Sequence, residues 1–584
     1  SRRLNLLLAD MEPLSSLVEL LAKRAESQPD DRAYIFLSDR GAEEAVISFR
    51  QLHYAANALA ARLSGVARPG ERALLVFPPG LEFIVAFFGC LIAGVIAVPM
   101  MMPRRQGARD SSAAIIANCE PVVALTSAAF AIRGDLQARF LREGLQWLSV
   151  DLAPSAVEAA TADVPPPQAR DIAFLQYTSG STSEPKGVAV SHANLLANLE
   201  MIRCALGNTR QSTYVNWVPL YHDMGLILNA LQTLYVGSLC VLMAPNAFTQ
   251  RPLNWLRAIH DYRAEVGCSP NFGYDHCVNR YRADQMQGID LSCWKVALNG
   301  AEPVHGETID RFIETFAGHG FQPATAFPAY GMAEATLLIS GGRRGAGHMT
   351  RTVSRSALQS HAVTAPTDAA DAQLLVGCGR ALINEQIAIV DPDRRTRLAA
   401  RMVGEIWVNG PNVARAYWRN PEATTAALNA GIAGEDDGAR WLRTGDLGFL
   451  DEAGELFVTG RIKDLIIVRG INHYPQDIER TVQSAHPAFR ANCGAAFAVA
   501  DERGEEMLVI VQEIERTERN RIDPTEMKGL IRENVTEHHE LFARHIVLIR
   551  PGTLPKTTSG KIQRSGARRL WLEQRFEDLG AGAD

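Results

Sequence analysis

The stretch that decides the fold reads Tyr177-Thr178-Ser179-Gly180-Ser181-Thr182-Ser183-Glu184-Pro185-Lys186-Gly187. It follows a short apolar run over residues 171–176, which predicts a buried strand that leads into this loop. Backbone N–H groups beside small residues can converge on an anion, and Lys186 adds a compact positive charge. The Walker spacing G-x-x-x-x-G-K-[S/T] is absent. The loop therefore predicts a phosphate site unlike that of the common nucleotide hydrolases, with a Ser/Gly-rich surface turn as the alternative.

Six further segments accompany the loop on its C-terminal side. They are Pro219-Leu220-Tyr221-His222-Asp223-Met224-Gly225, Asn299-Gly300-Ala301-Glu302-Pro303, Tyr330-Gly331-Met332-Ala333-Glu334, Arg443-Thr444-Gly445-Asp446, Gly460-Arg461-Ile462-Lys463-Asp464 and Pro555-Lys556-Thr557-Thr558-Ser559-Gly560-Lys561. In this order the set resembles the adenylate-forming superfamily, which includes the acyl-CoA synthetases and adenylation domains. The resemblance covers nearly the whole chain.

The bulk composition is that of a globular enzyme. A chain of 584 residues with 47% hydrophobic residues predicts two or more packed domains. A net charge of −6 gives no basic face for nucleic acid, so we expect no nucleic-acid partner. Nine cysteines without a C-x-x-C pair predict reduced thiols in a cytoplasmic protein.

The uncharged run from Phe83 to Met102 is about as long as a membrane span. Gly94 and Pro99 interrupt it, which favours a buried helix near 81–93 and a strand near 95–100. We therefore expect no transmembrane segment.

Helical patterns alternate with short apolar strands, such as Arg72–Phe77 and Leu239–Met243, through the first 460 residues. This rhythm predicts an α/β fold with largely parallel sheets. Together with the resemblance, it implies a large N-terminal domain over residues 1–460, of mostly parallel sheets with flanking helices. A small, mobile α+β C-terminal domain follows over residues 461–584.

Residues 341–372 form a polar, small-residue-rich segment, whose length indicates a loop or an added element. An insertion at this place resembles the one that marks the fatty acyl-AMP ligases within the superfamily. Two local sequences are also similar to those of that branch: Ser269-Pro270-Asn271-Phe272-Gly273-Tyr274 and Gly470-Ile471-Asn472-His473-Tyr474-Pro475. The alternative is a neutral surface insertion. We expect the insertion to pack against the C-terminal domain and to disfavour a coenzyme A-competent arrangement.

The resemblance implies roles for the nucleotide-binding residues. The phosphates of ATP would be held by Thr178, Ser179, Gly180, Ser181, Thr182 and Lys186. The adenine would be bordered by Gly300, Ala301, Glu302 and Tyr330, with Gly331 and Met332 beside it, and Tyr330 offers a stacking face. Asp446 would accept hydrogen bonds from the ribose hydroxyls, and Arg461 would reach ribose or phosphate. Glu334 would hold the Mg²⁺ that bridges phosphate oxygens.

The resemblance also implies the catalytic and acyl-binding groups. Lys561 would enter from the C-terminal domain and bind the carboxylate and α-phosphate oxygens, and His222 would border the acyl carboxylate. Met224, Gly225 and Phe272 would bind the acyl chain. Apolar residues near Met224 line a tunnel or are simply core, and the pattern leaves both open. Lys463 matches the hinge about which the C-terminal domain swings between half-reactions.

These assignments imply a fatty acyl-AMP ligase that uses ATP and Mg²⁺. It would convert a fatty acid to acyl-AMP, release pyrophosphate and pass the acyl group to the phosphopantetheine of an acyl carrier protein. We expect a separate carrier or a polyketide or nonribosomal synthase carrier domain. Arg564, Arg568 and Arg569 either meet that carrier or form a solvated helix face. The alternatives are a fatty acyl-CoA ligase and a catalytically silent nucleotide-binding regulator.

Overall fold

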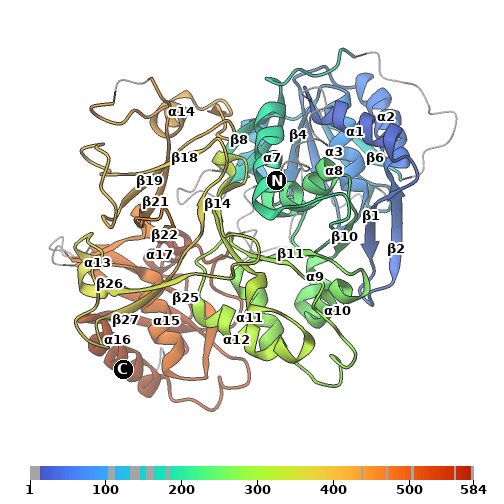
Figure 1. The fold of residues 1–584 in the computed structure, drawn as a ribbon. Coiled ribbons are helices and arrows are strands. Elements are labelled where there is room, and N and C mark those ends of the chain that lie inside the picture. The colour runs from blue at the N-terminus through green and yellow to red at the C-terminus, as the bar shows by residue number, and fades with distance from the viewer. Residues whose placement is uncertain are drawn as a thin grey trace.

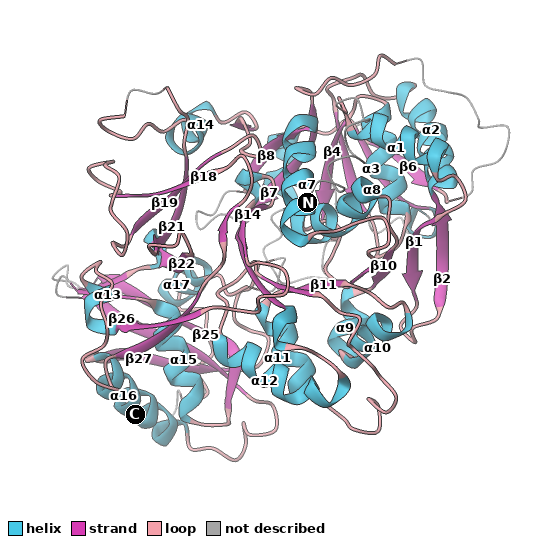
Figure 2. Ribbon diagram, viewed as in Figure 1, coloured by secondary structure: helices cyan, strands magenta, loops and turns pink. Residues whose placement is uncertain are grey.

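The computed structural model describes residues 14–102, 112–131, 145–152, 164–178, 185–435, 438–468, 471–500, 506–557 and 561–580 (Figures 1 and 2). The predicted phosphate-loop residues Ser179, Gly180, Ser181 and Thr182 lie outside this set. No helix among the described residues is both long and apolar enough to cross a bilayer.

A seven-stranded sheet has the order β20-β8-β7-β4-β3-β5-β6 and is parallel from β7 to β6. Its strands are β3 (Arg72–Val76), β4 (Ile96–Met100), β5 (Val123–Ser127), β6 (Gln146–Val150), β7 (Ile172–Thr178), β8 (Lys186–Ser191) and β20 (Ala416–Tyr417). The central strands are buried on both faces, which explains their continuous apolar sequence. The predicted helix near 81–93 is confirmed as α3 (Glu82–Ile92), followed by β4 as expected.

A nine-stranded sheet has the order β17-β14-β13-β12-β11-β9-β10-β1-β2 and is parallel from β13 to β1. Its strands are β1 (Arg32–Leu37), β2 (Glu43–Ser48), β9 (Tyr214–Asn216), β10 (Cys240–Met243), β11 (Val266–Ser269), β12 (Val296–Asn299), β13 (Ala326–Gly331), β14 (Leu338–Gly341) and β17 (Arg380–Ala381). The carboxyl ends of its parallel strands lie along one edge, where open α/β sheets bind ligands.

Helices flank these sheets, as the alternating sequence pattern predicts. They are α1 (Leu17–Ser27), α2 (Phe49–Ser64), α3, α4 (Ser112–Cys119), α5 (Ala128–Ala131), α7 (His192–Leu206), α8 (Gln232–Val236), α9 (Pro245–Gln250), α10 (Leu253–Asp261), α11 (Asn271–Asn279), α12 (Gly306–Phe316) and α14 (Pro421–Leu428). Their ends follow local chemistry: Ser48 and Gln51 form a capping box at the start of α2, and Gly207 ends α7 in the left-handed conformation. A π-helix, η2 (Met224–Leu231), precedes α8.

An antiparallel four-stranded sheet, ordered β18-β19-β21-β22, links the large sheets to the C-terminal region. Its strands are β18 (Gln386–Val390), β19 (Gly404–Asn409), β21 (Leu442–Leu450) and β22 (Leu456–Arg461). The C-terminal region contains β23 (Ile466–Val468), β24 (Ile471–His473), α15 (Pro475–Ala485), β25 (Phe489–Ala500), β26 (Glu506–Ile514), α16 (Pro524–His539), β27 (Ala543–Ile549) and α17 (Arg564–Leu572). Figure 1 shows these elements gathered in orange and red beside α11 and α12, which confirms the expected small α+β domain.

The predicted insertion over residues 341–372 is an ordered element. It contains β15 (Thr350–Ser354) and α13 (Arg355–Gln359), and β15 pairs with β16 (Ala372–Val376) in a two-stranded antiparallel sheet. Buried Val353 and Leu358 pack with Phe449 and Phe457 of the neighbouring four-stranded sheet. Apolar residues in an otherwise polar stretch thus anchor the insertion to the neighbouring sheet.

Candidate active site

A cavity of about 2000 Å³ lies between the large sheets and the C-terminal region. The predicted site residues that line it are Thr178, Lys186, His222, Met224, Phe272, Gly300, Ala301, Glu302, Tyr330, Gly331, Met332, Glu334, Asp446, Arg461, Lys463 and Lys561. Gly225 is not among them, because its Cα faces Pro219: an added Cβ would lie 2.1 Å from the Pro219 carbonyl oxygen. Leu226 and Ile227 are core residues, whereas Leu228 lines the cavity with Met224.

The part of the cavity predicted to bind phosphate lies at the β7–β8 hairpin. Thr178 and Lys186 are opposite each other in the antiparallel register, so the phosphate loop connects two adjacent strands. The Lys186 ammonium lies 5.1 Å from the centre of the Tyr417 ring, within cation–π range. Lys186 is thereby held at the base of the loop.

Glu334 lies in a short turn, η5 (Ala333–Ala335), and is buried. The Tyr417 hydroxyl donates to Glu334 Oε1 at 2.9 Å. Burial raises the pKa of the Glu334 carboxyl, and the Tyr417 hydrogen bond opposes that rise. Tyr417 therefore contacts Lys186, a predicted phosphate-binding residue, and Glu334, the predicted metal ligand, although no sequence motif indicated it. It reaches them because β20 pairs with β8, more than 220 residues earlier in the chain.

The predicted adenine wall is built from close backbone contacts. A Cβ on Gly300 would lie 2.8 Å from the Ala329 carbonyl oxygen, and one on Gly331 would lie 1.9 Å from that of Leu337. Ala301 has a φ of 69°, in the left-handed region that L residues rarely occupy. Strain of this kind, in the wall of a cavity, is typical of functional sites.

Glu302 follows this wall and is linked to Phe272, a predicted acyl-binding residue at the start of α11. The Phe272 N–H donates to Glu302 Oε1 at 2.6 Å. Burial raises the pKa of Glu302 to about 7, and the Phe272 hydrogen bond and the positive charge of Lys561 act against that rise. Glu302 therefore joins the nucleotide wall to the start of α11.

Asp446 is held by two donors. The Tyr330 hydroxyl donates to Oδ2 and the Arg461 Nε donates to Oδ1, both at 2.8 Å. Asp446 and Arg461 are partners in the antiparallel register of β21 and β22, so the strand pairing itself brings them together. The Asp446 charge raises the pKa of the Arg461 guanidinium above its ordinary value.

Lys561 lines the same cavity, although it belongs to the C-terminal region. Its N–H donates to Thr557 Oγ1 at 3.0 Å. Burial and the positive charge of Arg461 lower the pKa of Lys561, while the carboxylates of Asp223, Glu302 and Asp446 act to raise it. The ammonium group thus lies among acidic side chains from three segments of the N-terminal part.

His222 follows β9 and precedes the π-helix η2. Its Nδ1 lies 2.7 Å from Asp223 Oδ1. The part of the chain that the structure describes contains no group of three or more His, Cys, Asp or Glu side chains arranged to hold a metal ion by themselves. His222 is therefore part of a polar pair.

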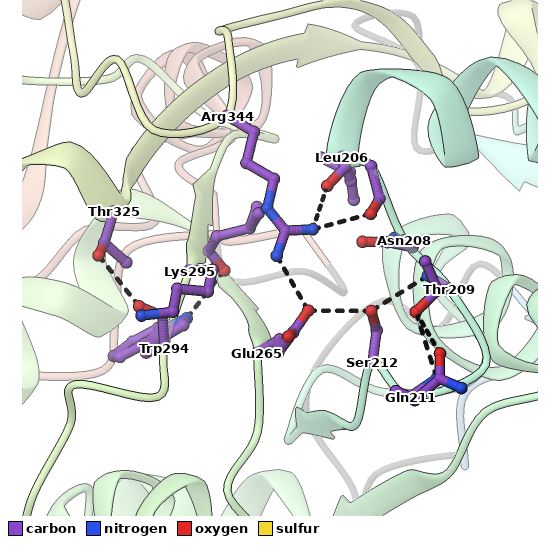
Figure 3. A network of polar contacts seen from close by, with 12 residues as sticks. Leu206, Asn208, Thr209, Gln211, Ser212, Glu265, Trp294, Lys295, Thr325 and Arg344 are labelled. Atoms are coloured by element: carbon purple, nitrogen blue, oxygen red, sulfur yellow. Dashed lines mark hydrogen bonds and ion pairs between the residues drawn. The ribbon is translucent and has the colours of Figure 1, made fainter. Parts of the chain in front are cut away.

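The insertion contacts both halves of the protein. At its N-terminal end, Arg344 donates to the carbonyl oxygens of Leu206 and Gly207, both at 2.9 Å, and pairs with Glu265 at 3.0 Å (Figure 3). Figure 3 also shows Ser212 donating to the same carboxylate, at 2.9 Å. This network fixes one end of the insertion to the N-terminal part.

Further contacts of the insertion reach the C-terminal region. Arg355 donates to the His538 carbonyl oxygen at 2.8 Å, and Asn472 Nδ2 donates to that of Gln359 at 2.9 Å. Gln373, just after the insertion, donates to Asp477 Oδ2 at 2.8 Å. The expectation that the insertion packs against the C-terminal region is confirmed.

One arginine proposed to face a carrier is internal. Arg564 forms a bidentate pair with Glu479, with both distances 2.7 Å, and also pairs with Asp464 at 3.0 Å. These ion pairs leave 18% of its side chain exposed, so Arg564 does not belong to a solvated helix face, the second of the two alternatives offered for it. Arg568 is exposed and Arg569 is half-buried.

Comparison with known proteins gives two family matches. The family model described as AMP-binding enzyme matches residues 21–418, and the one described as Disco-interacting protein 2-like, AMP domain, matches residues 463–579.

Among curated relatives, the chain is 42% identical to the medium-chain-fatty-acid–[acyl-carrier-protein] ligase JamA of Moorena producens, over 96% of this chain and 95% of that one. It is 36% identical to the corresponding ligase TtuA of Teredinibacter turnerae, over 95% and 93%. Among solved structures it resembles the fatty acyl-adenylate ligase of Legionella pneumophila in complex with acyl adenylate and pyrophosphate, with 39% identity, a TM-score of 0.73, and coverage of 97% of this chain and 98% of that one.

Proposed function

The chain belongs to the AMP-binding enzyme family, and from that membership we propose that it is a fatty acyl-AMP ligase that delivers its product to an acyl carrier protein. The observation that carries the proposal is the cavity that collects Lys186, Glu334, Asp446 and Lys561 from distant segments. Its relatives named as fatty-acid–[acyl-carrier-protein] ligases are similar over almost their full length. The reaction proceeds in two half-reactions.

The first half-reaction joins two anions. A carboxylate oxygen of the fatty acid attacks the α-phosphorus of ATP, and the bond to the β-phosphate oxygen breaks, which releases pyrophosphate. Positioned cations lower this barrier by neutralising the charge that grows on the phosphate oxygens. We assign that role to Lys561 at the α-phosphate and to Lys186 at the phosphates. Burial lowers the pKa of Lys561, so its ammonium group is already partly desolvated where an anion would meet it.

The ribose and adenine are bound by the remaining residues of the site. Asp446 accepts hydrogen bonds from the ribose hydroxyls, for which its fixed orientation between Tyr330 and Arg461 is suited. The close backbone contacts at Gly300 and Gly331 keep side chains away from the base and leave a flat wall. Burial of Tyr330 in this wall supports a stacking role.

The buried Glu334 fits a magnesium ion that is shared with substrate phosphates. Mg²⁺ in such sites binds one or two carboxylates, phosphate oxygens and water. Tyr417, whose ring lies 5.1 Å from the Lys186 ammonium, donates to Glu334 Oε1 and orients the carboxylate. When bound, Mg²⁺ neutralises charge on the phosphate oxygens. Glu334 is the residue we expect to hold it.

The acyl chain is placed at the end of the cavity lined by Met224, Leu228 and Phe272. Each buried methylene contributes about 0.8 kcal/mol of transfer free energy, so an apolar lining favours an alkyl chain of medium or greater length. The relatives named as medium-chain-fatty-acid ligases support this substrate class.

The second half-reaction requires the C-terminal domain to move. We place the domain boundary at residue 460 and the hinge at Lys463, next to Asp464, which Arg564 binds. The contacts of Arg355, Gln359 and Gln373 with the C-terminal domain limit this swing. A carrier protein that presents its own phosphopantetheine is then favoured over free coenzyme A.

We place the enzyme in the cytoplasm. None of the nine cysteines, all of which lie in the described parts of the chain, forms a disulfide, and eight of them are buried, as expected in a reducing compartment.

One assay tests the proposal. The protein is incubated with ATP, Mg²⁺ and fatty acids of graded length, with and without coenzyme A, and the products are read by mass spectrometry. We expect acyl-AMP and pyrophosphate from medium or long chains, with little acyl-CoA. Accumulation of acyl-CoA would favour the alternative fatty acyl-CoA ligase. Absence of pyrophosphate with every acid would favour a silent nucleotide-binding regulator.

A further inference from the structure

Lys561 lies in a segment that is held by hydrogen bonds close to the backbone. The Thr557 N–H donates to the Lys561 carbonyl oxygen at 2.7 Å, and the Lys561 N–H donates to Thr557 Oγ1 at 3.0 Å. The Gln563 N–H donates to the Pro555 carbonyl oxygen at 2.9 Å, and α17 begins at the next residue, Arg564. A restraint on Arg564 therefore acts on Lys561 through a short stretch of chain.

The Arg564 side chain binds two other elements. Its guanidinium forms two hydrogen bonds of 2.7 Å with the Glu479 carboxylate of α15 and one of 3.0 Å with Asp464 Oδ2. Asp464 ends the short 3₁₀-helix η6 (Ile462–Asp464), which contains Lys463, the proposed hinge. The three side chains of this cluster are largely buried, with 18%, 9% and 16% of their surfaces exposed. A planar bidentate pair fixes orientation as well as distance, which a lysine ammonium does not.

An ion pair borders the proposed hinge on each side. Before Lys463, Arg461 pairs with Asp446 of the N-terminal part at 2.8 Å. After it, Asp464 pairs with Arg564 of the C-terminal part at 3.0 Å. Rotation is thereby confined to the residues between the two pairs, and Asp464 moves together with α17.

Other contacts bind the Lys561 segment to the C-terminal sheet. Lys556 Nζ donates to the Asn492 carbonyl oxygen of β25 at 3.1 Å, and the Leu554 N–H donates to Glu513 Oε1 of β26 at 2.9 Å. These two contacts hold the segment within its own domain. The connection to η6 is the one that Arg564 supplies.

We propose that Arg564 is a positioning residue for acyl-AMP formation, because it joins the Lys561 segment to Asp464 and so fixes how far the ammonium reaches past the hinge toward the α-phosphate. The inference rests on the proposed function and deepens it. Lys561 contacts the substrate, whereas Arg564 acts through Lys561. In the second half-reaction the C-terminal domain has swung and carried Lys561 away, so the link contributes to the first half-reaction alone.

The test measures the two half-reactions separately. Acyl-AMP formation is followed in single turnovers with Mg²⁺, dodecanoic acid and a series of ATP concentrations, and transfer is followed with chemically prepared dodecanoyl-AMP and pantetheine. Arg564→Lys keeps the positive charge and loses the bidentate geometry. We expect its maximal rate of acyl-AMP formation to fall about 10- to 100-fold, as for a reacting group misplaced by about 1 Å. The half-saturating ATP concentration and the transfer rate should stay close to those of the wild type.

Asp464→Ala separates the link to the hinge from the burial of an arginine, because it leaves the pair of Arg564 with Glu479 in place. It also decides the question if Arg564→Lys does not fold. We expect a selective loss of acyl-AMP formation here too. Acyl-AMP formation at the wild-type rate in Asp464→Ala, or a loss in either variant that is equal for the two half-reactions, would overturn the proposal.

Arg203→Lys is the matched control. Arg203 of α7 forms a bidentate pair with Glu200, again with both distances 2.7 Å, and 21% of its side chain is exposed. It is not among the described residues that line the cavity, so both rates should match those of the wild type. A fall in acyl-AMP formation as large as that of Arg564→Lys would refute the role of Arg564. A wild-type enzyme that forms no acyl-AMP would instead refute the proposed function.

Discussion

Three acidic groups that face the cavity are each held by a neighbour that donates to them. Tyr417 donates to Glu334, Tyr330 to Asp446, and the Phe272 N–H to Glu302. A buried carboxylate held in this way is already oriented before substrate arrives, so less reorganisation is needed in the transition state.

Tyr417→Phe tests the orientation of Glu334. The change removes one hydrogen bond to a carboxylate, an interaction of about 1.5–3 kcal/mol, and leaves the ring over Lys186. We expect acyl-AMP formation to fall about 10- to 100-fold, with a raised requirement for Mg²⁺ in a titration of initial rates. Tyr235→Phe is the matched control, because its hydroxyl also donates to a glutamate, Glu200, but does not line the cavity. Equal effects of the two changes would contradict the role of Tyr417.

Glu302 gives the stability of the protein a pH dependence. Burial raises its pKa from 4.5 to about 7, so between these values the unfolded chain has lost a proton that the folded protein keeps. Stability therefore falls as pH rises through this window. Glu302→Gln should flatten that fall and stabilise the protein at pH 8 by at most about 3 kcal/mol, measured as Tm at pH 5 and pH 8. A Tm difference between variant and wild type that is the same at both pH values would refute this account.

At the scale of elements, the insertion of β15 and α13 connects the two halves of the enzyme. Arg344 binds it to the N-terminal part (Figure 3). Arg355 and Gln373 bind it and its paired strand to the C-terminal part. Such contacts favour the arrangement of the domains in which they form, because they lower the free energy of that arrangement and not of the others.

Removal of the C-terminal contacts tests this restraint. We expect the double variant Arg355→Ala/Gln373→Ala to increase acyl-CoA formation several-fold when coenzyme A replaces the carrier. The reason is that fewer contacts must break before the C-terminal domain can swing. The assay is mass spectrometry of acyl-CoA at fixed enzyme and time. Arg343→Ala, an exposed arginine of the same insertion, is the control. No rise in acyl-CoA, either in the double variant or after deletion of residues 341–372, would contradict the restraint.

At the scale of the whole molecule, much of the architecture could be predicted from sequence. Short apolar runs such as β3 and β10 are buried on both faces, so their local sequence is enough to predict that they are strands. The predicted site residues rest on motifs, and His222, Gly300 and Glu334 follow the ends of β9, β12 and β13. The domain that carries Lys561 was also expected, because its strands and helices have their own apolar pattern.

The parts that were missed depend on tertiary pairing. Tyr417 reaches Glu334 only because the two-residue strand β20 pairs with β8, and no local pattern indicates that contact. Arg564 was expected on a surface, yet Glu479 and Asp464 bind it from other elements. The order within the insertion rests on Val353 and Leu358, two apolar residues in a polar stretch, packing on a distant sheet.

The central claim is that the C-terminal domain brings the Lys561 ammonium to the nucleotide for acyl-AMP formation. Lys561→Met keeps the apolar stem and removes the charge, and the product is measured as acyl-AMP formed per enzyme in the presence of ATP, Mg²⁺ and dodecanoic acid. We predict a loss of at least about 100-fold, equivalent to about 2.7 kcal/mol, with Tm close to that of the wild type. Acyl-AMP formation at the wild-type rate would contradict the account.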